Sequence, residues 1–450
     1  MRLKHLLFGA AAGVAMMAAS GASAQSIELW TTETQSERQA TIQLLVDTFM
    51  ALNPGITVDV VAVDENDVPT QIAAAAAAGT LPNLINAGSE LMVAFGEEGI
   101  LDQAAATEMV EEIGTDRFFA GALNMHRNPE SGEYYALPFH GWIQGIWYRG
   151  DWFDEAGLEP PNTWENIRAA AEYFYEPAEN QYGILIGNMA DAFAEQVFTQ
   201  IVISNGGRQF DADGNLVFNS EPVREALEYY VDLAQYAPPG PQTWRARDYY
   251  IQGKMAMFFY SSFIMDDLAL AEVAAGSLTS ENFAELAGTS FDPDLVNNTR
   301  MVPIIANTQD AGYGVVVSLG IVESDDAAET EAAQQLLSFL YEPDSYITWL
   351  HMAPGGMNPV LRDIAASEDY MSDPRGIFTR YGSDSIEEII EGLEAIQTFS
   401  LVDGQVFPAS GEIFARQIIP QMIFRATWED VPVDEAVAWA EAQMLDVISE

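Results

Sequence analysis

A short segment, residues 147–167, constrains the fold of this chain more than any other stretch. It begins in an apolar, β-prone run at Ile146–Tyr148 and continues into a short helix, Asp151–Ala156, that ends at a glycine. Pro160–Pro161 then forces an extended link, after which Thr163 can cap a second helix. The order of strand, helix, proline break and helix predicts alternating α and β elements in this region.

The same alternation runs along the rest of the chain. Short apolar runs predict strands at Ser26–Trp30, Thr57–Val61, Leu84–Asn86, Tyr135–Pro138, Tyr182–Ile186, Ala256–Phe259 and Val315–Leu319. Helices are predicted at Glu37–Leu52, Val68–Ala78, Ile167–Tyr175, Val223–Ala234, Glu331–Tyr341, Ile386–Phe399 and Val433–Ile448. The pattern predicts an α/β protein, and 450 residues exceed one comfortable core, so we expect two lobes.

The sequence predicts a secretory signal peptide over residues 1–24. Arg2 and Lys4 precede the apolar stretch Leu6–Ala19, and the small residues Ala22–Ala24 predict cleavage before Gln25. An N-terminal membrane anchor is the alternative, but the apolar stretch is short for a membrane span. The sequence has no cysteine, so a lipid-anchoring cysteine, disulfides and thiolate chemistry are excluded. We therefore expect a freely diffusing periplasmic protein.

Acidic residues far outnumber basic ones. The chain has 68 Asp and Glu against 18 Lys and Arg, a formal net charge of −50, and loses two more positive charges with the signal peptide. Such a polyanion does not bind nucleic acid or an anionic membrane, because both attract basic residues. With 49% hydrophobic residues the chain should fold rather than stay disordered. The acidic shell indicates either adaptation to a saline habitat or an ordinary acidic bias.

Several motifs occur in the order found in one transport family. The segment WYRGDWFDEAGLEPPNTWENI at 147–167 is followed by Asn205–Gly207, by YIQGKMAM at Tyr250–Met257, by Gly312–Gly314 and by Gly355–Pro359. Together they resemble the extracellular solute-binding proteins of ABC importers, in the sugar-binding cluster that includes maltose-binding protein. The first hundred residues after the predicted signal peptide match that family more loosely.

This resemblance implies a two-lobed periplasmic-binding-protein fold of type II, with ligand held in the cleft. The lobes would be joined by three crossings, near Phe139–Trp142, Phe259–Ser262 and Tyr313–Val316. The first lobe would comprise residues 25–138 and 261–313, and the second lobe residues 139–260 and 314–450. The family implies a monomer that closes around one small ligand and delivers it to the permease subunits of an ABC transporter.

Matched motifs and strand ends also supply candidate ligand contacts. A sugar ring needs flat aromatic platforms together with carboxylates, amides and arginines that fix its hydroxyls. The candidates are Trp30, Asp64, Glu90, His140, Trp142, Trp244, Ser261, Phe263, Tyr313, Gly355, Asn358 and Arg362. The core is the alternative for Trp142, Trp244 and Phe263, and a surface salt bridge is the alternative for Arg362. The sequence does not show which of Asp64, Glu65 and Asp67 faces the cleft. A cleft wall should contribute little to the core, so Trp142→Ala should leave the ligand-free stability nearly unchanged.

The sequence gives little support for a catalytic or metal-dependent function. The motifs G-x-S-x-G, G-x-x-x-x-G-K-[ST] and H-E-x-x-H are absent, and His126, His140 and His351 are too far apart for a local zinc motif. We expect no catalytic residues, no metal site and no cofactor, although a secreted glycosidase is a rival of a different class. Tyr249–Tyr250 is reminiscent of a ferric-binding pair, but Tyr250 fits a core position.

The sequence indicates the class of ligand less clearly than the class of protein. His140-Gly141-Trp142 replaces a family carboxylate at the first crossing, which argues against maltodextrin itself. A sugar, an oligosaccharide or a sugar-glycerol conjugate is the first expectation. A quaternary ammonium osmolyte in an aromatic cage, held by cation–π attraction, is the alternative.

Overall fold

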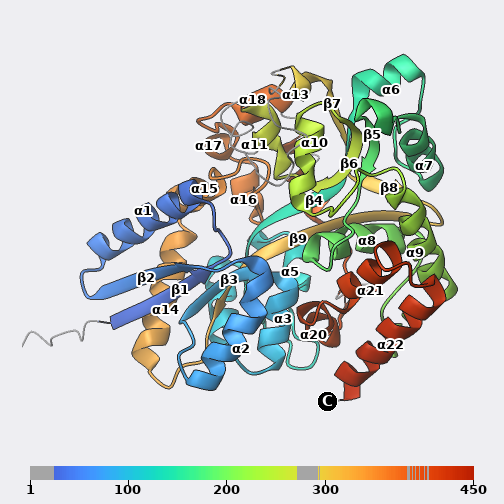
Figure 1. Cartoon of the computed structure of the whole chain (residues 1–450). Helices are drawn as coiled ribbons and strands as arrows, with labels where there is room; N and C mark the ends of the chain where they lie inside the picture. Colours follow the sequence, from blue (N-terminus) through green and yellow to red (C-terminus); the bar gives the residue numbers. More distant parts are fainter. Residues whose placement is uncertain are drawn as a thin grey trace, which may run out of the picture.

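One mixed β-sheet runs through the centre of the protein (Figure 1). The computed structural model describes residues 25–270, 292, 294–382, 386–387, 389–390, 392–394, 396–399, 401–402 and 405–449, so the predicted signal peptide lies outside it. The main strand order is β2-β1-β3-β9-β4-β6-β5, and β7, β8 and β10 pair at its flanks. We call β2-β1-β3 the first half of the sheet and β4-β6-β5 the second half.

The strands confirm most of the predicted ones. Their bounds are β1 Gln25–Thr31, β2 Ile56–Ala62, β3 Leu84–Gly88, β4 Leu137–Arg149, β5 Tyr182–Leu185, β6 Met255–Ser261, β7 Thr299–Val302, β8 Ile304–Ala306, β9 Asp310–Ile321, β10 Asn358–Pro359, β11 Leu401–Val402 and β12 Gln405–Val406. β1 is parallel to β2 and β3, whereas β9 runs antiparallel to both β3 and β4. Because β9 pairs with β3 at one end and with β8 at the other, it connects the two halves.

Helices cover the sheet on both halves. They are α1 Ser36–Leu52, α2 Val68–Ala78, α3 Ser89–Glu97, α4 Gln103–Ile113, α5 Ala120–Asn124, α6 Gly150–Ala156, α7 Trp164–Tyr173, α8 Ala192–Ser204, α9 Glu221–Ala234, α10 Asp248–Ile251, α11 Ile264–Ala269, α13 Leu295–Asn298, α14 Ala327–Leu340, α15 Pro343–Leu350, α16 Arg362–Ala365, α17 Glu368–Met371, α18 Ile377–Tyr381, α20 Ala409–Ala415, α21 Ile418–Thr427 and α22 Val433–Ser449. Short 3₁₀ turns lie at η1 Glu65–Asp67, η2 Thr115–Arg117, η3 Pro177–Glu179, η4 Trp244–Arg247 and η6 Gly392–Glu394.

The corner predicted around the proline pair forms as expected. α6 ends at Gly157, whose φ of +66° lies in the left-handed region that glycine adopts without strain. Thr163 caps α7, because its hydroxyl accepts a hydrogen bond from the Asn166 backbone N–H at 3.2 Å. Local sequence therefore determines the direction in which the chain leaves β4.

Several predicted elements were wrong in extent, and the strand expected at Val315–Leu319 is only part of the longer β9, Asp310–Ile321. The strand expected at Tyr135–Pro138 is instead the start of β4, which continues to Arg149 with every residue buried. The helix expected at Ile386–Phe399 does not form over residues 396–398, which have no regular structure, although part of that range lies outside the described residues.

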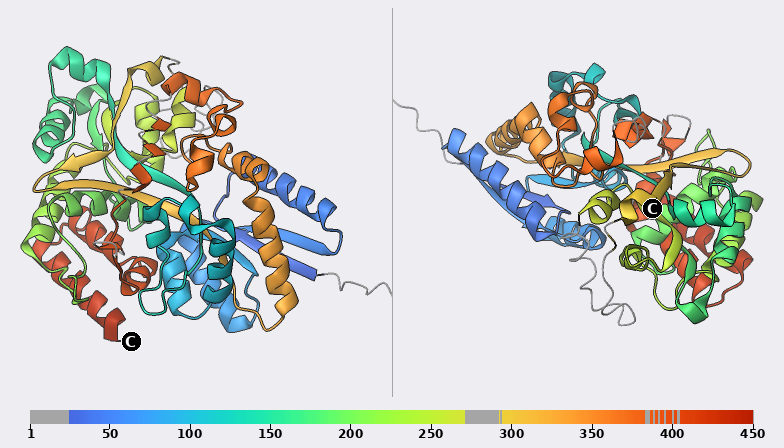
Figure 2. Two further views of the ribbon diagram at one scale, coloured as in Figure 1. Left: turned by 180° about the vertical axis from the view of Figure 1, so that it is seen from behind. Right: turned by 90° about the horizontal axis from the view of Figure 1, so that it is seen from above.

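The lobe boundaries, still a prediction, need revision at two places. α14 packs on β1 and contacts α1 and α4, and Figure 2 (left) shows it lying across the strands of the first half. It therefore belongs beside the first half, not in the second lobe to which residues 314–450 were assigned. Conversely, β8 pairs with β9 and lies beside Thr163 in the second half, although residues 261–313 were assigned to the first lobe.

The C-terminal helices complete the second half. α21 and α22 pack on each other and on α9, and α21 also contacts α8. α20 packs on α3 of the first half, so this part of the chain joins the two halves (Figure 1). Within the described residues, no helix has the length and apolar character needed to cross a membrane.

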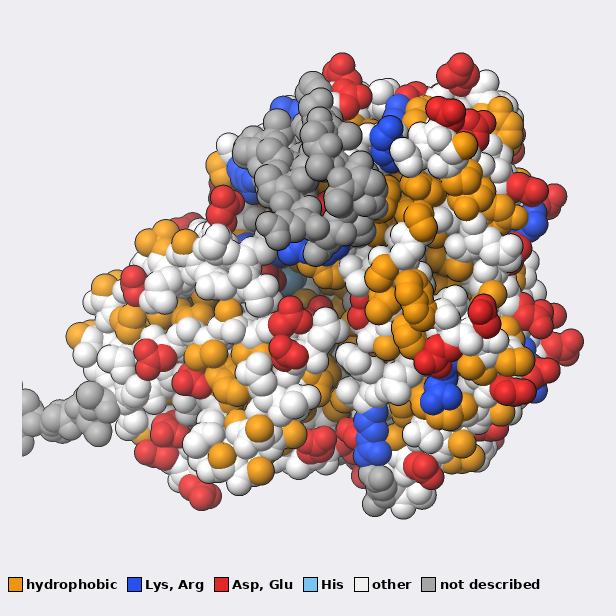
Figure 3. All heavy atoms as spheres, in the orientation of Figure 1, with side chains coloured by type: hydrophobic (Ala, Val, Ile, Leu, Met, Phe, Trp, Pro, Cys, Tyr) orange, Lys and Arg blue, Asp and Glu red, His pale blue; other side chains and the backbone are white. Residues whose placement is uncertain are grey.

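The acidic side chains lie mainly at the surface, where red spheres are spread over the visible face and blue ones are few (Figure 3).

We expect the melting temperature of the ligand-free protein to rise with salt, because the negative charges behind the formal net charge of −50 repel one another. The Debye length falls from about 30 Å at 0.01 M to about 3 Å at 1 M, so the rise should be steep at first and then level. Scanning fluorimetry over a chloride series at neutral pH measures it. A flat series would show that surface repulsion does not limit stability.

Candidate functional site

A cavity of about 250 Å³ opens between the two halves of the molecule. The first half contributes the segments that follow the carboxyl ends of β1 and β2, namely Thr32–Gln35 and Asp64–Asn66, as well as Gly88 at the end of β3. Crevices at the carboxyl ends of strands are where open α/β sheets bind ligands. The second half contributes the start of α8, the end of β6 and residues of η4.

Several aromatic side chains line this cavity. Trp142 on β4 packs edge-on against Tyr313, with ring centroids 6.0 Å apart, and both join Val315 and Val317 in one apolar cluster. Phe263 packs against that cluster and borders the cavity. Trp244 also lines the cavity and is 36% exposed, which leaves it accessible to a ligand. These rings are the flat apolar surfaces that a sugar face requires.

Two ion pairs line the polar walls. Arg38 on α1 lies 2.9 Å from Glu33, and its guanidinium stands 4.9 Å from the centre of the Phe263 ring. In the second half, Arg247 lies 2.8 Å from Asp267, and Arg247 Nη1 donates to the Tyr260 hydroxyl at 2.6 Å. Each arginine is therefore already charge-paired, and the remaining carboxylates give the cavity an acidic character.

Desolvation raises the pKa of three of these carboxyls, that of Glu65 to about 7. Desolvation, and then the charge of Asp267, raise the pKa of Asp266 to about 6, while Arg38 and Arg247 oppose the shift. Desolvation also raises the pKa of Asp191 to about 6, although Asp191 Oδ1 accepts the Ala194 N–H at 3.1 Å as the N-cap of α8. Carboxyl groups of this kind accept hydrogen bonds from hydroxyls, and near pH 6 a fraction of them can also donate.

The structure brings part of the predicted set together. Asp64, Trp142, Trp244, Ser261 and Phe263 all line the cavity, as does Glu65 but not Asp67. Glu90 and Tyr313 do not border it but line a separate, smaller cavity nearby. The ligand role of these residues stays a prediction.

The other candidates lie outside the cavity. Trp30 donates through Nε1 to Glu28 and packs on a core cluster, and His140 is fully buried, which lowers its pKa to about 3 and keeps it neutral. Asn358 donates through Nδ2 to the Gly355 carbonyl at 2.7 Å and to the Gly141 carbonyl at 3.2 Å, which ties the turn to β4. Arg362 pairs with Glu394 and donates to the Phe118 carbonyl, as the salt-bridge alternative anticipated.

The sequence analysis did not predict several of the residues that line the cavity. They are Glu33, Arg38, Asp191, Gln196, Arg247, Tyr260, Asp266 and Asp267. One local signal was available, since Asp191 precedes a helix in an N-cap position. The two arginines carry no such signal, because they reach the cavity only through the packing of α1 and η4.

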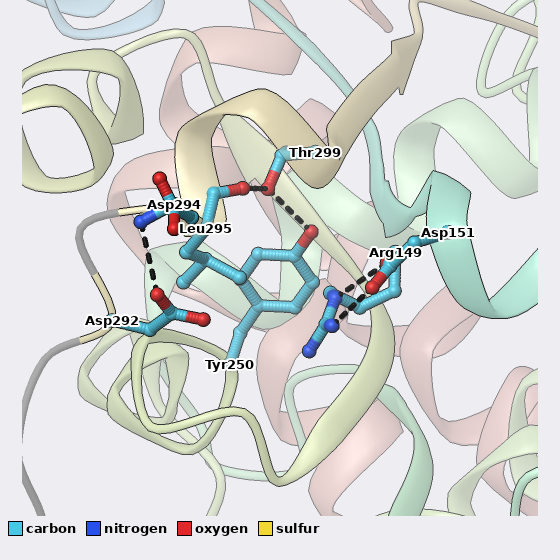
Figure 4. A network of polar contacts seen from close by, with 7 residues as sticks. All are labelled: Arg149, Asp151, Tyr250, Asp292, Asp294, Leu295 and Thr299. Atoms are coloured by element: carbon cyan, nitrogen blue, oxygen red, sulfur yellow. Dashed lines mark hydrogen bonds and ion pairs between the residues drawn. The ribbon is translucent and has the colours of Figure 1, made fainter.

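Tyr250 is confirmed as a core residue. It is fully buried, and its hydroxyl lies 2.8 Å from Thr299 Oγ1, which in turn donates to the Leu295 carbonyl (Figure 4). Nearby, Arg149 pairs with Asp151. The tyrosine thus ties α10 to the start of β7 and does not line the cavity.

Two α/β halves around a ligand-sized cleft define the class of periplasmic binding proteins. The chain belongs to the bacterial extracellular solute-binding protein family, whose model matches residues 33–347. YcjN of Escherichia coli (strain K12), whose name describes an ABC transporter periplasmic-binding protein, is 28% identical over 403 residues, which cover 89% of this chain and 88% of that protein.

Solved structures agree with this fold. The maltose-bound MalE3 of T. maritima superposes with a TM-score of 0.74 at 17% identity, covering 94% of this chain and all of that one. A solute-binding protein of Agrobacterium radiobacter K84 in complex with ribitol also gives a TM-score of 0.74, at 19% identity and with 94% and 98% coverage. These likenesses show the fold and confirm the two-lobed α/β architecture expected from the sequence.

Proposed function

We propose that this protein is the periplasmic binding component of an ABC importer and that its ligand is a carbohydrate or a related polyol. In this proposal the chain is exported by its signal peptide, cleaved before Gln25, works as a monomer, and delivers the ligand to permease subunits. The observation that carries the proposal is the cavity between the two halves, where aromatic rings face carboxylates and paired arginines.

The chemistry of the walls suits a neutral polyhydroxyl ligand. Trp142, Phe263 and Trp244 offer apolar faces for ring C–H groups. Asp64 and Asp191 offer oxygen acceptors for hydroxyls, while Gln196 can both accept and donate. Maltose and ribitol, found in proteins of the same fold, are ligands of this chemical kind.

Binding without turnover distinguishes this proposal from a glycosidase. The family consists of binding proteins, and in this proposal the carboxylates of the cavity bind hydroxyls of the ligand. Incubation with aryl glycosides and oligosaccharides should release no product. Hydrolysis at an enzymatic rate would replace the receptor proposal.

A thermal-shift screen over sugars, polyols and osmolytes tests the ligand class. A cognate sugar or polyol at a hundred times its Kd should stabilise the protein by about 2.7 kcal/mol, because it binds the folded state alone. Betaine and choline in the same screen test the alternative of a quaternary ammonium ligand held in an aromatic cage. A shift with quaternary ammonium compounds and none with any sugar or polyol would overturn the carbohydrate proposal.

A further inference from the structure

Buried polar side chains surround a second, much smaller cavity of about 10 Å³. Its walls include Glu90, Glu195, Thr199, Gln209, Tyr313 and Ser410, none more than 8% exposed. A polar space of about this size holds one water-sized particle. The cavity is distinct from the proposed sugar site, and its occupant does not depend on which ligand the protein transports.

Glu195 on α8 gives the strongest indication of an occupant. Its side chain is 5% exposed, and its Oε2 atom is buried without a hydrogen-bond partner among the described residues. Buried polar atoms are nearly always hydrogen-bonded, so a carboxylate oxygen of this kind calls for a partner that the protein itself does not provide.

The second carboxylate comes from the other half of the molecule. Glu90 opens α3, next to the end of β3, and its Oε2 accepts a hydrogen bond from Ser89 Oγ at 3.0 Å. α20 packs closely behind it, since a Cβ on Gly411 would lie 2.8 Å from the Glu90 backbone oxygen. The segment that carries Glu90 is therefore tightly packed against α20.

The remaining polar lining also offers oxygen atoms. Gln209 Oε1 accepts from Ser410 Oγ at 2.6 Å, and the hydroxyls of Thr199 and Tyr313 complete the wall. In the described part of the chain, no group of three or more histidine, aspartate or glutamate side chains could hold a metal ion, so neutral oxygens would have to complete a coordination shell. Carboxylate, amide and hydroxyl oxygens with flexible geometry suit calcium better than magnesium, which demands a near-ideal octahedron.

We propose that a calcium-sized cation binds in this cavity between Glu90 and Glu195 and links the two halves behind the cleft. One divalent ion would neutralise both carboxylates, which come from the two halves of the molecule. A cation that holds the halves together also favours the arrangement in which they enclose the ligand. Calcium should therefore raise ligand affinity, and ligand should raise calcium affinity by the same factor.

The test uses the full mature protein, freed of metal with a chelator and kept in about 0.3 M KCl so that surface repulsion is screened. Titration calorimetry with CaCl₂ should give one site per chain. Scanning fluorimetry should show a saturable rise of at least about 2 °C. Glu195→Gln should lose both responses. Glu228→Gln, which removes an exposed carboxylate on α9, should keep them.

Three outcomes would overturn the inference. Equal responses to MgCl₂ and CaCl₂ that persist in Glu195→Gln would show general binding to the acidic surface. A native protein that does not respond to calcium would show that water or a proton fills the cavity. A response to NaCl alone, against the KCl background, would exclude a divalent site. None of these results shows whether the protein binds a sugar, so this inference and the proposed function fail separately.

Discussion

Replacing Arg247 with alanine should lower the free energy of unfolding by about 3–5 kcal/mol, because the change leaves a buried carboxylate without its ion-pair partner. Arg247 Nη2 lies 2.8 Å from Asp267 Oδ2, and the two side chains are only 10% and 4% exposed. The same guanidinium donates to the Tyr260 hydroxyl. Urea unfolding at pH 7 measures the loss.

A neighbouring arginine provides a matched control. Arg245 lies in the same 3₁₀ turn, is exposed, and stacks over Trp244 at 4.4 Å. Arg245→Ala should cost less than about 1 kcal/mol. Adding Asp267→Asn to Arg247→Ala should recover part of the lost stability, since the uncompensated charge is then removed. Equal losses for the two arginine variants would show that the buried pair has no special role.

Trp142→Ala should weaken ligand binding by about 1–3 kcal/mol and also destabilise the ligand-free protein by about 3–5 kcal/mol. The first effect follows from its place in the cavity wall. The second follows from its packing against Tyr313, Val315 and Val317 with 8% of its surface exposed. The packing of Trp142 replaces the sequence-based expectation of nearly unchanged stability, because this residue lies in the cavity wall and is also packed in an apolar cluster.

Trp244→Ala separates the two effects. Trp244 borders the same cavity but is 36% exposed, so its loss should reduce affinity while costing less than about 1 kcal/mol of stability. Calorimetry with the ligand found by the thermal-shift screen, together with urea unfolding, measures both quantities. If Trp142→Ala lowered stability without changing affinity, Trp142 would have to be removed from the site.

Short elements with clear ends were predictable from the sequence, and long buried ones were not. β1 and β2 begin and end within a residue of their predicted bounds, because polar or turn residues flank their apolar runs. β4 was truncated because its thirteen residues are buried on both faces, which removes the alternation that marks a strand. Its extent depends on pairing with β6, β7 and β9, which are distant in sequence.

Some residues of the candidate site could likewise be predicted from the sequence, and others could not. Asp64 and Ser261 were found because they follow or end strands, where the chain order alone places a residue at the sheet edge. Arg38 and Asp266 were missed because they reach the cavity through the packing of α1 and α11. Asn358 was included because its motif matched, yet its amide is occupied by backbone carbonyls. A motif marks a position in the fold, whereas ligand contact depends on where the side chain points.

Small-angle scattering with and without ligand tests the central claim most directly, namely that two lobes close around one small molecule. Hinge closure around a ligand is the expected response of such proteins. At saturating ligand the radius of gyration should fall and the scattering profile should change shape, at the same monomeric mass. Superimposable profiles, with calorimetry confirming full occupancy on the same sample, would contradict the account.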